Sequence, residues 1–168
     1  MNPGGIIMVH RDRVVVFLAA LIIMVPISAA AADEEGVAAV ALVLDRFHEA
    51  AAKADGSRYF GFFSPDATFI GTDASERWTV DEFRAFAEPY FDRGRGWTYA
   101  ATSRHIRING DTAWFDEMLE NEAYGTCRGT GVLIRTESGW KIAQYHLTIP
   151  IPNDLAKSVV EMIRKGAS

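Results

Sequence analysis

The segment from about Glu35 to Ala54 has apolar residues at helical spacing. They recur every three or four residues, which predicts an amphipathic helix. The sequence T-V-D-E at 79–82 has the form of a capping box and predicts the start of a second long helix. Between these helices we expect a short aromatic helix or turn at 57–63 and a short strand at 67–70.

The pattern then changes to long segments that alternate in the manner of strands. Four strands are predicted at about 97–108, 112–122, 127–136 and 140–149. Asn109-Gly110 is the strongest hairpin signal, and Glu137-Ser138-Gly139 fits a three-residue loop between the last two strands. These four strands are expected to form an antiparallel meander.

Helices that precede an antiparallel sheet predict an α+β fold. We expect a cone-shaped domain in which a strongly curved sheet of about four long strands wraps around the N-terminal helices. Concave spaces of this kind hold small ligands. A C-terminal helix is predicted after Asn153 or Asp154, with these apolar residues facing inward: Leu155, Val159, Met162 and Ile163.

The first 32 residues predict a secretory signal peptide. A basic start at 10–13 precedes an apolar run at 14–27, and small residues at 28–32 provide cleavage sites. The alternative is an uncleaved membrane anchor, but the run is shorter than the about 20 residues that a span requires. We therefore predict an exported protein, periplasmic or secreted, with a single mature domain at 33–168.

The charge of the mature domain disfavours two classes of partner. Cleavage after Ala32 would remove Arg11, Asp12 and Arg13, which changes the net charge from −5 to −6. An acidic domain without a basic cluster is a poor candidate for binding nucleic acid or, after cleavage, a membrane. Cys127 is the single cysteine, so an internal disulfide is impossible and a buried thiol is expected rather than an intermolecular bridge.

The last hairpin carries the first group of candidate binding residues. Its predicted register places Thr130 opposite His146 and Arg128 opposite Thr148, with Gln144 on the same face. That face would be apolar near the turn and polar away from it, and we expect a ligand at the polar end. His146 is a candidate proton shuttle, because imidazole exchanges a proton near neutral pH. The alternative is a hydrogen-bonded core histidine.

Two adjacent carboxylates are candidate catalytic bases. Asp116 and Glu117 must point to opposite faces of their strand, and the hairpin at 109–110 is expected to turn Glu117 inward. A carboxylate in a dry pocket has a raised pKa, which suits a general base. The alternative is a structural ion pair of Glu117 with Arg104 or Arg128, because a buried charge usually has a partner.

The polar loop at 71–78 contributes further candidates. Asp73, Glu76 and Trp78 are expected to lie at the mouth of the cone and contact a ligand, the alternative being a solvated loop anchored by Trp78. The histidines and the cysteine show no metal-ligand spacing. The chain also has neither a glycine-rich phosphate loop nor a nucleophile elbow. We therefore predict no metal and no cofactor.

Three motifs in this order of elements carry a family resemblance. They are F-I-G-T-D-A-S-E-R-W at 69–78, A-W-F-D-E at 113–117 and G-W-K-I-A-Q-Y-H at 139–146. Over about residues 37–153 the chain resembles the nuclear transport factor 2 superfamily, and within it the polyketide-cyclase-like (SnoaL-like) proteins. The resemblance implies a cone-shaped α+β domain with a pocket, often dimeric through the outer sheet face. The superfamily includes isomerases, cyclases, dehydratases and members that only bind ligands or partners. In the isomerases and cyclases a strand carboxylate acts as the base.

Three functional hypotheses follow. The first is a domain that binds a small, partly apolar molecule, which requires a cavity of about 300 Å³ or more. The second is an isomerase- or cyclase-type enzyme with Glu117 or Asp116 as base, and His146 or Arg128 polarising a carbonyl. The third is an interaction module whose cone is filled by side chains such as Phe62, Phe83, Phe86 and Phe115.

A homodimer is also expected from the pattern of the last strand. Its outer face is predicted to form an apolar patch too large for a monomer to leave exposed. A second copy of the chain or the C-terminal helix would cover this patch, which consists of Leu133, Lys141, Ala143, Tyr145, Leu147 and Ile149.

Overall fold

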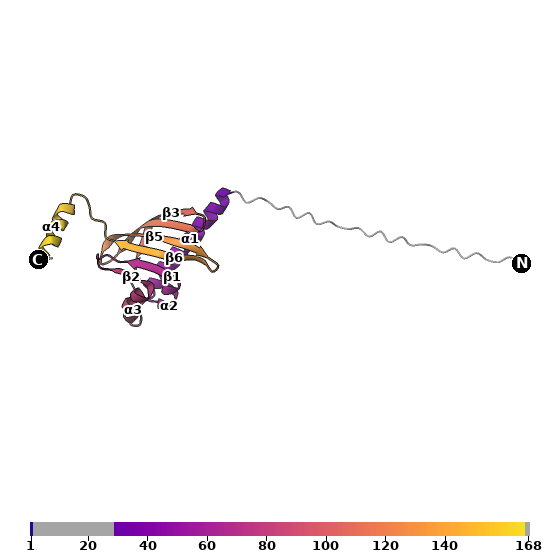
Figure 1. Cartoon of the computed structure of the whole chain (residues 1–168), viewed down its shortest axis with the longest axis horizontal. Coiled ribbons are helices and arrows are strands. Elements are labelled where there is room, and N and C mark those ends of the chain that lie inside the picture. Colours follow the sequence, from indigo (N-terminus) through magenta and orange to yellow (C-terminus); the bar gives the residue numbers. More distant parts are fainter. Residues whose placement is uncertain (2–28, 167–168) are drawn as a thin grey trace.

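The computed structural model describes residue 1 and residues 29–166, with side chains from Glu34 onward in the second range. The predicted signal peptide therefore lies almost entirely outside the described residues. Figure 1 shows a body of sheet and helices with a further helix standing apart at the C-terminal end. No helix in the described ranges is long and apolar enough to cross a membrane.

The described residues form four helices, and the first begins at Ala29, earlier than the predicted start near Glu35. They are α1 (Ala29–Ala52), α2 (Gly56–Gly61), α3 (Val80–Phe91) and α4 (Ala156–Gly166). The capping box predicted before α3 is confirmed: the Thr79 hydroxyl accepts the N–H of Glu82 at 3.3 Å. The Glu82 carboxylate in turn accepts the N–H of Thr79 at 2.8 Å.

The strands form one curved sheet in the order β2-β1-β6-β5-β4-β3. Their bounds are β1 (Phe63–Ile70), β2 (Arg77–Thr79), β3 (Ala100–Asn109), β4 (Thr112–Asn121), β5 (Gly125–Thr136) and β6 (Gly139–Thr148). The predicted meander of four long strands is confirmed as β3 to β6. The sheet extends further, because β1 pairs with β6 in parallel and β2 pairs with β1 antiparallel. The α+β fold predicted for the chain is confirmed.

The β3–β4 hairpin closes one residue later than predicted. Asn109 pairs with Thr112, so the loop is Gly110-Asp111, and Gly110 adopts a φ of 59° that favours glycine. The slip moves each pairing by two residues, which leaves the faces unchanged. Glu117 therefore points inward as predicted, and Asp116 is exposed on the outer face.

In the β5–β6 hairpin, a bulge at Ala143 restores the predicted pairing beyond it and reverses which side chains of β6 face the core. Thr136 pairs with Gly139, so the loop has two residues and not the predicted three. Leu133 then pairs with Ile142 but Val132 pairs with Gln144, which leaves Ala143 as the extra residue of a bulge. Beyond the bulge, Thr130 lies opposite His146 and Arg128 opposite Thr148, as predicted.

The predicted inward-facing polar end of this hairpin is wrong, because the bulge turns it outward. Trp140 and Ile142 are buried on the near side of the bulge, and Tyr145 and Leu147 are buried on the far side. Arg128, Thr130, Gln144 and His146 therefore lie on the outer face of the sheet. The predicted apolar outer patch is also wrong. Tyr145 and Leu147 follow the bulge and are core residues, and the two-residue turn pairs Leu133 with the buried Ile142.

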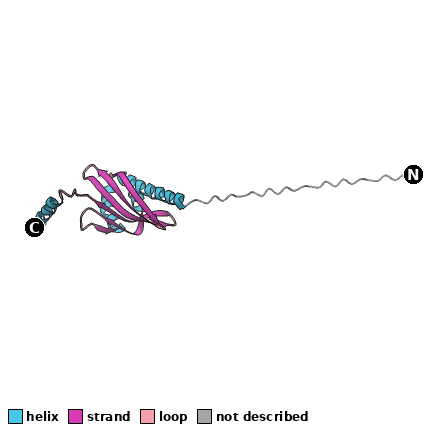
Figure 2. Ribbon diagram, turned by 90° about the horizontal axis from the view of Figure 1, so that it is seen from above, coloured by secondary structure: helices cyan, strands magenta, loops and turns pink. Residues whose placement is uncertain are grey.

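The core lies between the concave face of the sheet and α1, α2 and α3. Figure 2 shows the helices of the body on one face of the sheet. On α1 the buried stripe includes Val40, Leu44 and Phe47, which are at most 2% exposed. Cys127 is a buried free thiol, as predicted.

Helix α4 forms as predicted but does not pack inward. None of its residues is buried, and Met162 and Ile163 are 62% and 63% exposed. Figures 1 and 2 both show α4 separated from the body. The predicted inward face of this helix is therefore wrong.

Candidate functional site

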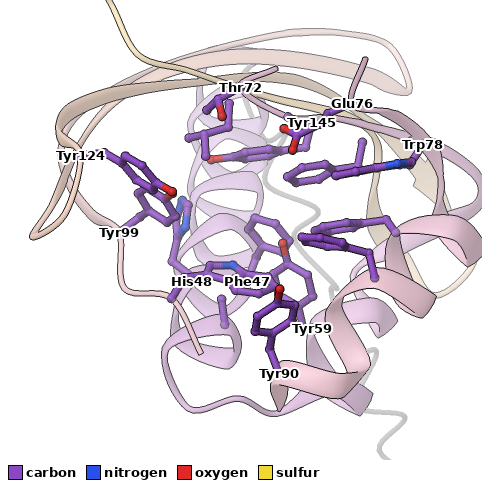
Figure 3. Close-up of a pocket in the computed structure, with 17 residues that line it drawn as sticks. Phe47, His48, Tyr59, Thr72, Glu76, Trp78, Tyr90, Tyr99, Tyr124 and Tyr145 are labelled. Atoms are coloured by element: carbon purple, nitrogen blue, oxygen red, sulfur yellow. The ribbon is translucent and has the colours of Figure 1, made fainter. Parts of the chain in front are cut away.

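A cavity of about 340 Å³ lies between the helices and the concave face of the sheet. Its size exceeds the roughly 300 Å³ expected of a small-molecule site. The cone is therefore not filled by its own side chains. Figure 3 shows the residues that line it, which are Phe47, His48, Ala51, Tyr59, Phe69, Gly71, Thr72, Glu76, Trp78, Phe83, Phe86, Tyr90, Trp97, Tyr99, Tyr124, Tyr145 and Leu147.

Aromatic rings make up most of the cavity wall. Eleven of the 17 described lining residues are Phe, Tyr or Trp. Phe83 stacks on Phe69 at 3.8 Å between ring centroids, and Trp78 stacks on Phe86 at 5.0 Å. Phe86 and Tyr90 are 45% and 41% exposed, so aromatic surface reaches the solvent at the opening. Such a wall offers a large apolar contact area to a ligand.

One fully buried carboxylate lies directly behind this wall. Glu117 is 0% exposed and accepts three hydrogen bonds. His48 Nε2 is 2.7 Å and the Tyr145 hydroxyl 3.1 Å from Oε1, while Arg104 Nε donates to Oε2 at 2.8 Å. Arg104 also donates to Asp45 at 2.7 Å, so an ionic chain runs from the protein surface to the cavity wall.

Glu117 is held in its ionised form. Burial alone would raise the pKa of Glu117, but the hydrogen bonds and charges of His48 and Arg104 lower it below its ordinary value. The ion pair with Arg104 that we considered as an alternative is present. The raised pKa that would suit Glu117 as a general base is not found, and the carboxylate does not itself line the cavity.

His48 connects the buried carboxylate to the cavity. Its side chain is 11% exposed and lines the cavity, while Nε2 contacts Glu117. In the described part of the chain, Nδ1 has no hydrogen-bond partner. A carboxylate that holds one ring nitrogen sets the orientation of the imidazole. His48 is thus placed to accept a proton from a bound molecule.

Three phenol groups of the wall, those of Tyr59, Tyr99 and Tyr145, have raised pKa values. Burial, followed by the charge of Glu117, raises the pKa of Tyr145 well above its ordinary value. Burial likewise raises the pKa of Tyr59, and it raises the pKa of Tyr99 to about 12. These hydroxyls are therefore hydrogen-bond donors and acceptors, not anions.

The loop between β1 and β2 places a second carboxylate at the cavity. The Glu76 side chain folds back over the loop and accepts the N–H of Asp73 at 3.1 Å. Gly71 allows this approach, because a Cβ there would lie 2.1 Å from Glu76 Oε2. Of the predicted loop residues, Glu76 and Trp78 line the cavity, whereas Asp73 does not. Hydrogen bonds from Ser75 lower the pKa of Asp73.

The remaining predicted site residues lie elsewhere. Asp116, Arg128 and Gln144 are exposed on the outer face of the sheet, and Thr130 and His146 are half-buried there. None of these side chains lines the cavity. In the described ranges there is also no group of three or more His, Cys, Asp or Glu side chains that could hold a metal ion.

Two residues of the site, His48 and Tyr145, were missed at the sequence level. His48 lies four residues after Leu44 on the buried stripe of α1, and a histidine on such a stripe is a detectable signal. Arg104 was considered only as a structural partner of Glu117. Tyr145 was assigned to the outer face, and the bulge at Ala143 that brings it inside has no signature in the local sequence.

A helix-backed, strongly curved sheet around an aromatic cavity defines a class of cone-shaped α+β pocket proteins. The chain belongs to the SnoaL-like domain family, whose match covers residues 40–152. No match is found among curated proteins.

Solved structures of the same fold are numerous and distant in sequence. One, from Streptomyces avermitilis, is a candidate dehydratase of the nuclear transport factor 2-like family. It has a TM-score of 0.62 and 17% identity, over 71% of this chain and 99% of that one. A nuclear transport factor 2-like protein of unknown function from Pseudomonas putida has a TM-score of 0.60 and 15% identity, over 74% and 91% of the two chains.

A third structure, a candidate aromatic ring hydroxylase from Novosphingobium aromaticivorans, has a TM-score of 0.59 and 20% identity. The likeness covers 71% of this chain and 92% of that one. At these identities the comparisons establish the fold alone. The different activities named for such similar folds agree with the general rule that function depends on the site.

Proposed function

We propose that the protein binds a small, largely apolar molecule in the aromatic cavity, where His48 and Glu76 are the ionisable side chains in the described lining. The cavity of about 340 Å³ is the observation that carries this proposal. Burial of an apolar ligand against the rings supplies affinity, and a few placed polar groups supply orientation.

Native mass spectrometry of the protein purified from its own host would look for the ligand directly. A complementary titration uses N-phenyl-1-naphthylamine, an uncharged dye that fluoresces in apolar sites. Thr72 is an exposed residue that lines the cavity, whereas the neighbouring Ala74 is exposed and does not line it. Thr72→Trp should therefore weaken dye binding by about tenfold or more, and Ala74→Trp should not. Equal binding by both variants would exclude the cavity as the site.

A second candidate function is catalysis of proton transfer. It is favoured by the contact of 2.7 Å between His48 Nε2 and Glu117, with the other ring nitrogen available to the cavity. In this scheme His48 is the general base and Glu117 orients it, which reverses the role we first considered for Glu117. The proton removed from a C–H next to a carbonyl moves to His48 Nδ1 and leaves an enolate; His48 then returns the proton to a different carbon of that enolate's conjugated system, as an isomerisation requires.

Exchange of hydrogen for deuterium tests this activity once a ligand is known. In D₂O the wild-type protein should exchange an acidic C–H of that ligand, as measured by mass spectrometry. His48→Gln should reduce the exchange rate by about 10²-fold or more. His146→Gln is the matched control, because His146 lies on the outer face. An unchanged rate in His48→Gln would exclude this role.

We also propose that the chain is exported, on the basis of the basic start and apolar run within residues 1–32. N-terminal sequencing of the protein from the culture medium and the cell envelope would test it. Recovery of a chain that still begins at the leader would contradict the proposal.

A further inference from the structure

The charges around the cavity wall are strongly one-sided. Among the described residues that line it there is no lysine and no arginine. Glu76 is the carboxylate in this lining, and it has no cationic partner in the described part of the chain. Its carboxylate accepts the backbone N–H of Asp73, which does not cancel its charge. A bound molecule therefore meets an uncompensated negative charge.

The other end of the cavity adds no net positive charge. A proton on His48 is balanced by the buried carboxylate of Glu117, and Arg104 is balanced by Asp45. These four groups together are neutral or negative in every protonation state in which the carboxylates are ionised. In Figure 3, Glu76 lies on one side of the cavity, and His48 lies beside Phe47 on another side.

The ring faces of the wall act in the same direction. The face of an aromatic ring carries partial negative charge and attracts cations. Trp78 lines the same cavity as Glu76 and stacks with Phe83 and Phe86, so its ring system belongs to a continuous aromatic surface. The Arg93 guanidinium, which is not part of the cavity lining, lies 5.3 Å from the centre of the Tyr90 ring.

We infer that the cavity selects apolar molecules that carry an amine, with the ammonium group at Glu76 and Trp78, and rejects the corresponding carboxylates. This inference rests on the proposed function, because it specifies the ligand of the same cavity. An ammonium group would donate a charge-assisted hydrogen bond to the Glu76 carboxylate and would contact the rings. A carboxylate would lose its hydration without gaining a cation, which is costly.

Three compounds with one skeleton separate the two proposals. They are 1-naphthylmethylamine, 1-naphthalenemethanol and 1-naphthoate, which are cationic, neutral and anionic at pH 7. Isothermal titration of each into the full mature chain measures binding. We expect the amine to bind at least about tenfold more tightly than the alcohol, and the carboxylate to bind most weakly.

Two variants test whether Glu76 causes the preference for the amine. Glu76→Gln should remove the advantage of the amine and leave the affinity for the alcohol within about twofold. Glu88→Gln is the control, because Glu88 is an exposed carboxylate on α3 outside the cavity lining. Circular dichroism melting curves confirm that both variants fold.

Each outcome bears on a different proposal. Binding of the alcohol as tight as that of the amine, or tightest binding of the carboxylate, overturns the charge preference and leaves the cavity as a binding site. Retention of the preference in Glu76→Gln overturns the assignment to Glu76. If none of the three compounds binds and the apolar dye also fails to bind, the proposed function itself fails and takes the inference with it.

Discussion

Replacing Arg104 with methionine tests whether the buried ionic chain stabilises the fold. The substitution keeps an unbranched apolar stem and removes the cation. Glu117 remains fully buried and keeps its hydrogen bonds to His48 and Tyr145, but it loses the Arg104 Nε–H bond of 2.8 Å. Removing one partner of a buried ion pair costs about 3–5 kcal/mol.

The structure places the expected loss at the low end of that range. Glu117 keeps two of its three hydrogen bonds in the variant. The variant also loses the ion pair between Arg104 and Asp45, but the Asp45 side chain is 63% exposed. An exposed ion pair contributes at most about 1 kcal/mol. We therefore expect Arg104→Met to lower the free energy of unfolding at pH 7 by about 3 kcal/mol, and Asp45→Asn to lower it by less than about 1 kcal/mol.

The loss of unfolding free energy in Arg104→Met should depend on pH. The pKa of Glu117 in the folded protein is lowered, so its stabilising effect is present above the ordinary carboxyl pKa and is lost as the pH falls through the lowered value. The difference between wild type and Arg104→Met should therefore shrink in acid. Urea denaturation at a series of pH values measures it. A loss below 1 kcal/mol at pH 7, or a loss equal to that of Asp45→Asn, would refute the reasoning.

Two further substitutions probe packing rather than charge. Gly129→Ala would place a Cβ 2.4 Å from the Tyr145 hydroxyl and 2.9 Å from Glu117 Oε1, and we expect it to cost about 2 kcal/mol by urea denaturation. Gly61→Ala is the control, because nothing lies near a Cβ added there. If adding Tyr145→Phe does not restore part of the stability lost in Gly129→Ala, the clash with the Tyr145 hydroxyl is not the cause of the loss. Ending the chain after Asn153 removes α4, which has no buried residue, and should change the free energy of unfolding by less than about 0.5 kcal/mol. A larger loss would mean that α4 packs on the domain in solution.

The fold was predictable because its signals are local and repeated. The capping box at Thr79, the turn near Asn109 and the alternation along four strands each specify one element, and together they specify a meander packed on helices. The exact position of the turn mattered less. Each residue of β3 pairs two positions away from its predicted partner, and a shift by an even number of residues leaves the side chains of β4 on their predicted faces. The parallel pairing of β1 with β6 joins distant segments and carried no local signal.

The candidate site was only partly predictable, because faces depend on parity. One extra residue at Ala143 reverses the orientation of every side chain that follows it in β6. Tyr145 was therefore predicted outside and lies inside, and His146 the reverse. Glu117 was placed correctly because no bulge intervenes between the β3–β4 turn and its own position. Glu76 and Trp78 were found because a polar loop with one large aromatic is unusual enough to be noticed.

The same bulge connects the stability of the domain with the chemistry of its cavity. By turning Tyr145 inward it supplies the third hydrogen bond to Glu117, and the hydroxyl also fills the space that Gly129 leaves open. Glu117 then needs a cation because it is buried, and Arg104 meets that need from the surface side. Glu117 Oε1 also contacts His48 Nε2, and this contact holds the imidazole at the cavity wall. A group that is ionised for structural reasons thereby determines which nitrogen of His48 is left to meet a ligand, so substitutions of Arg104 should alter the cavity chemistry as well as the free energy of unfolding.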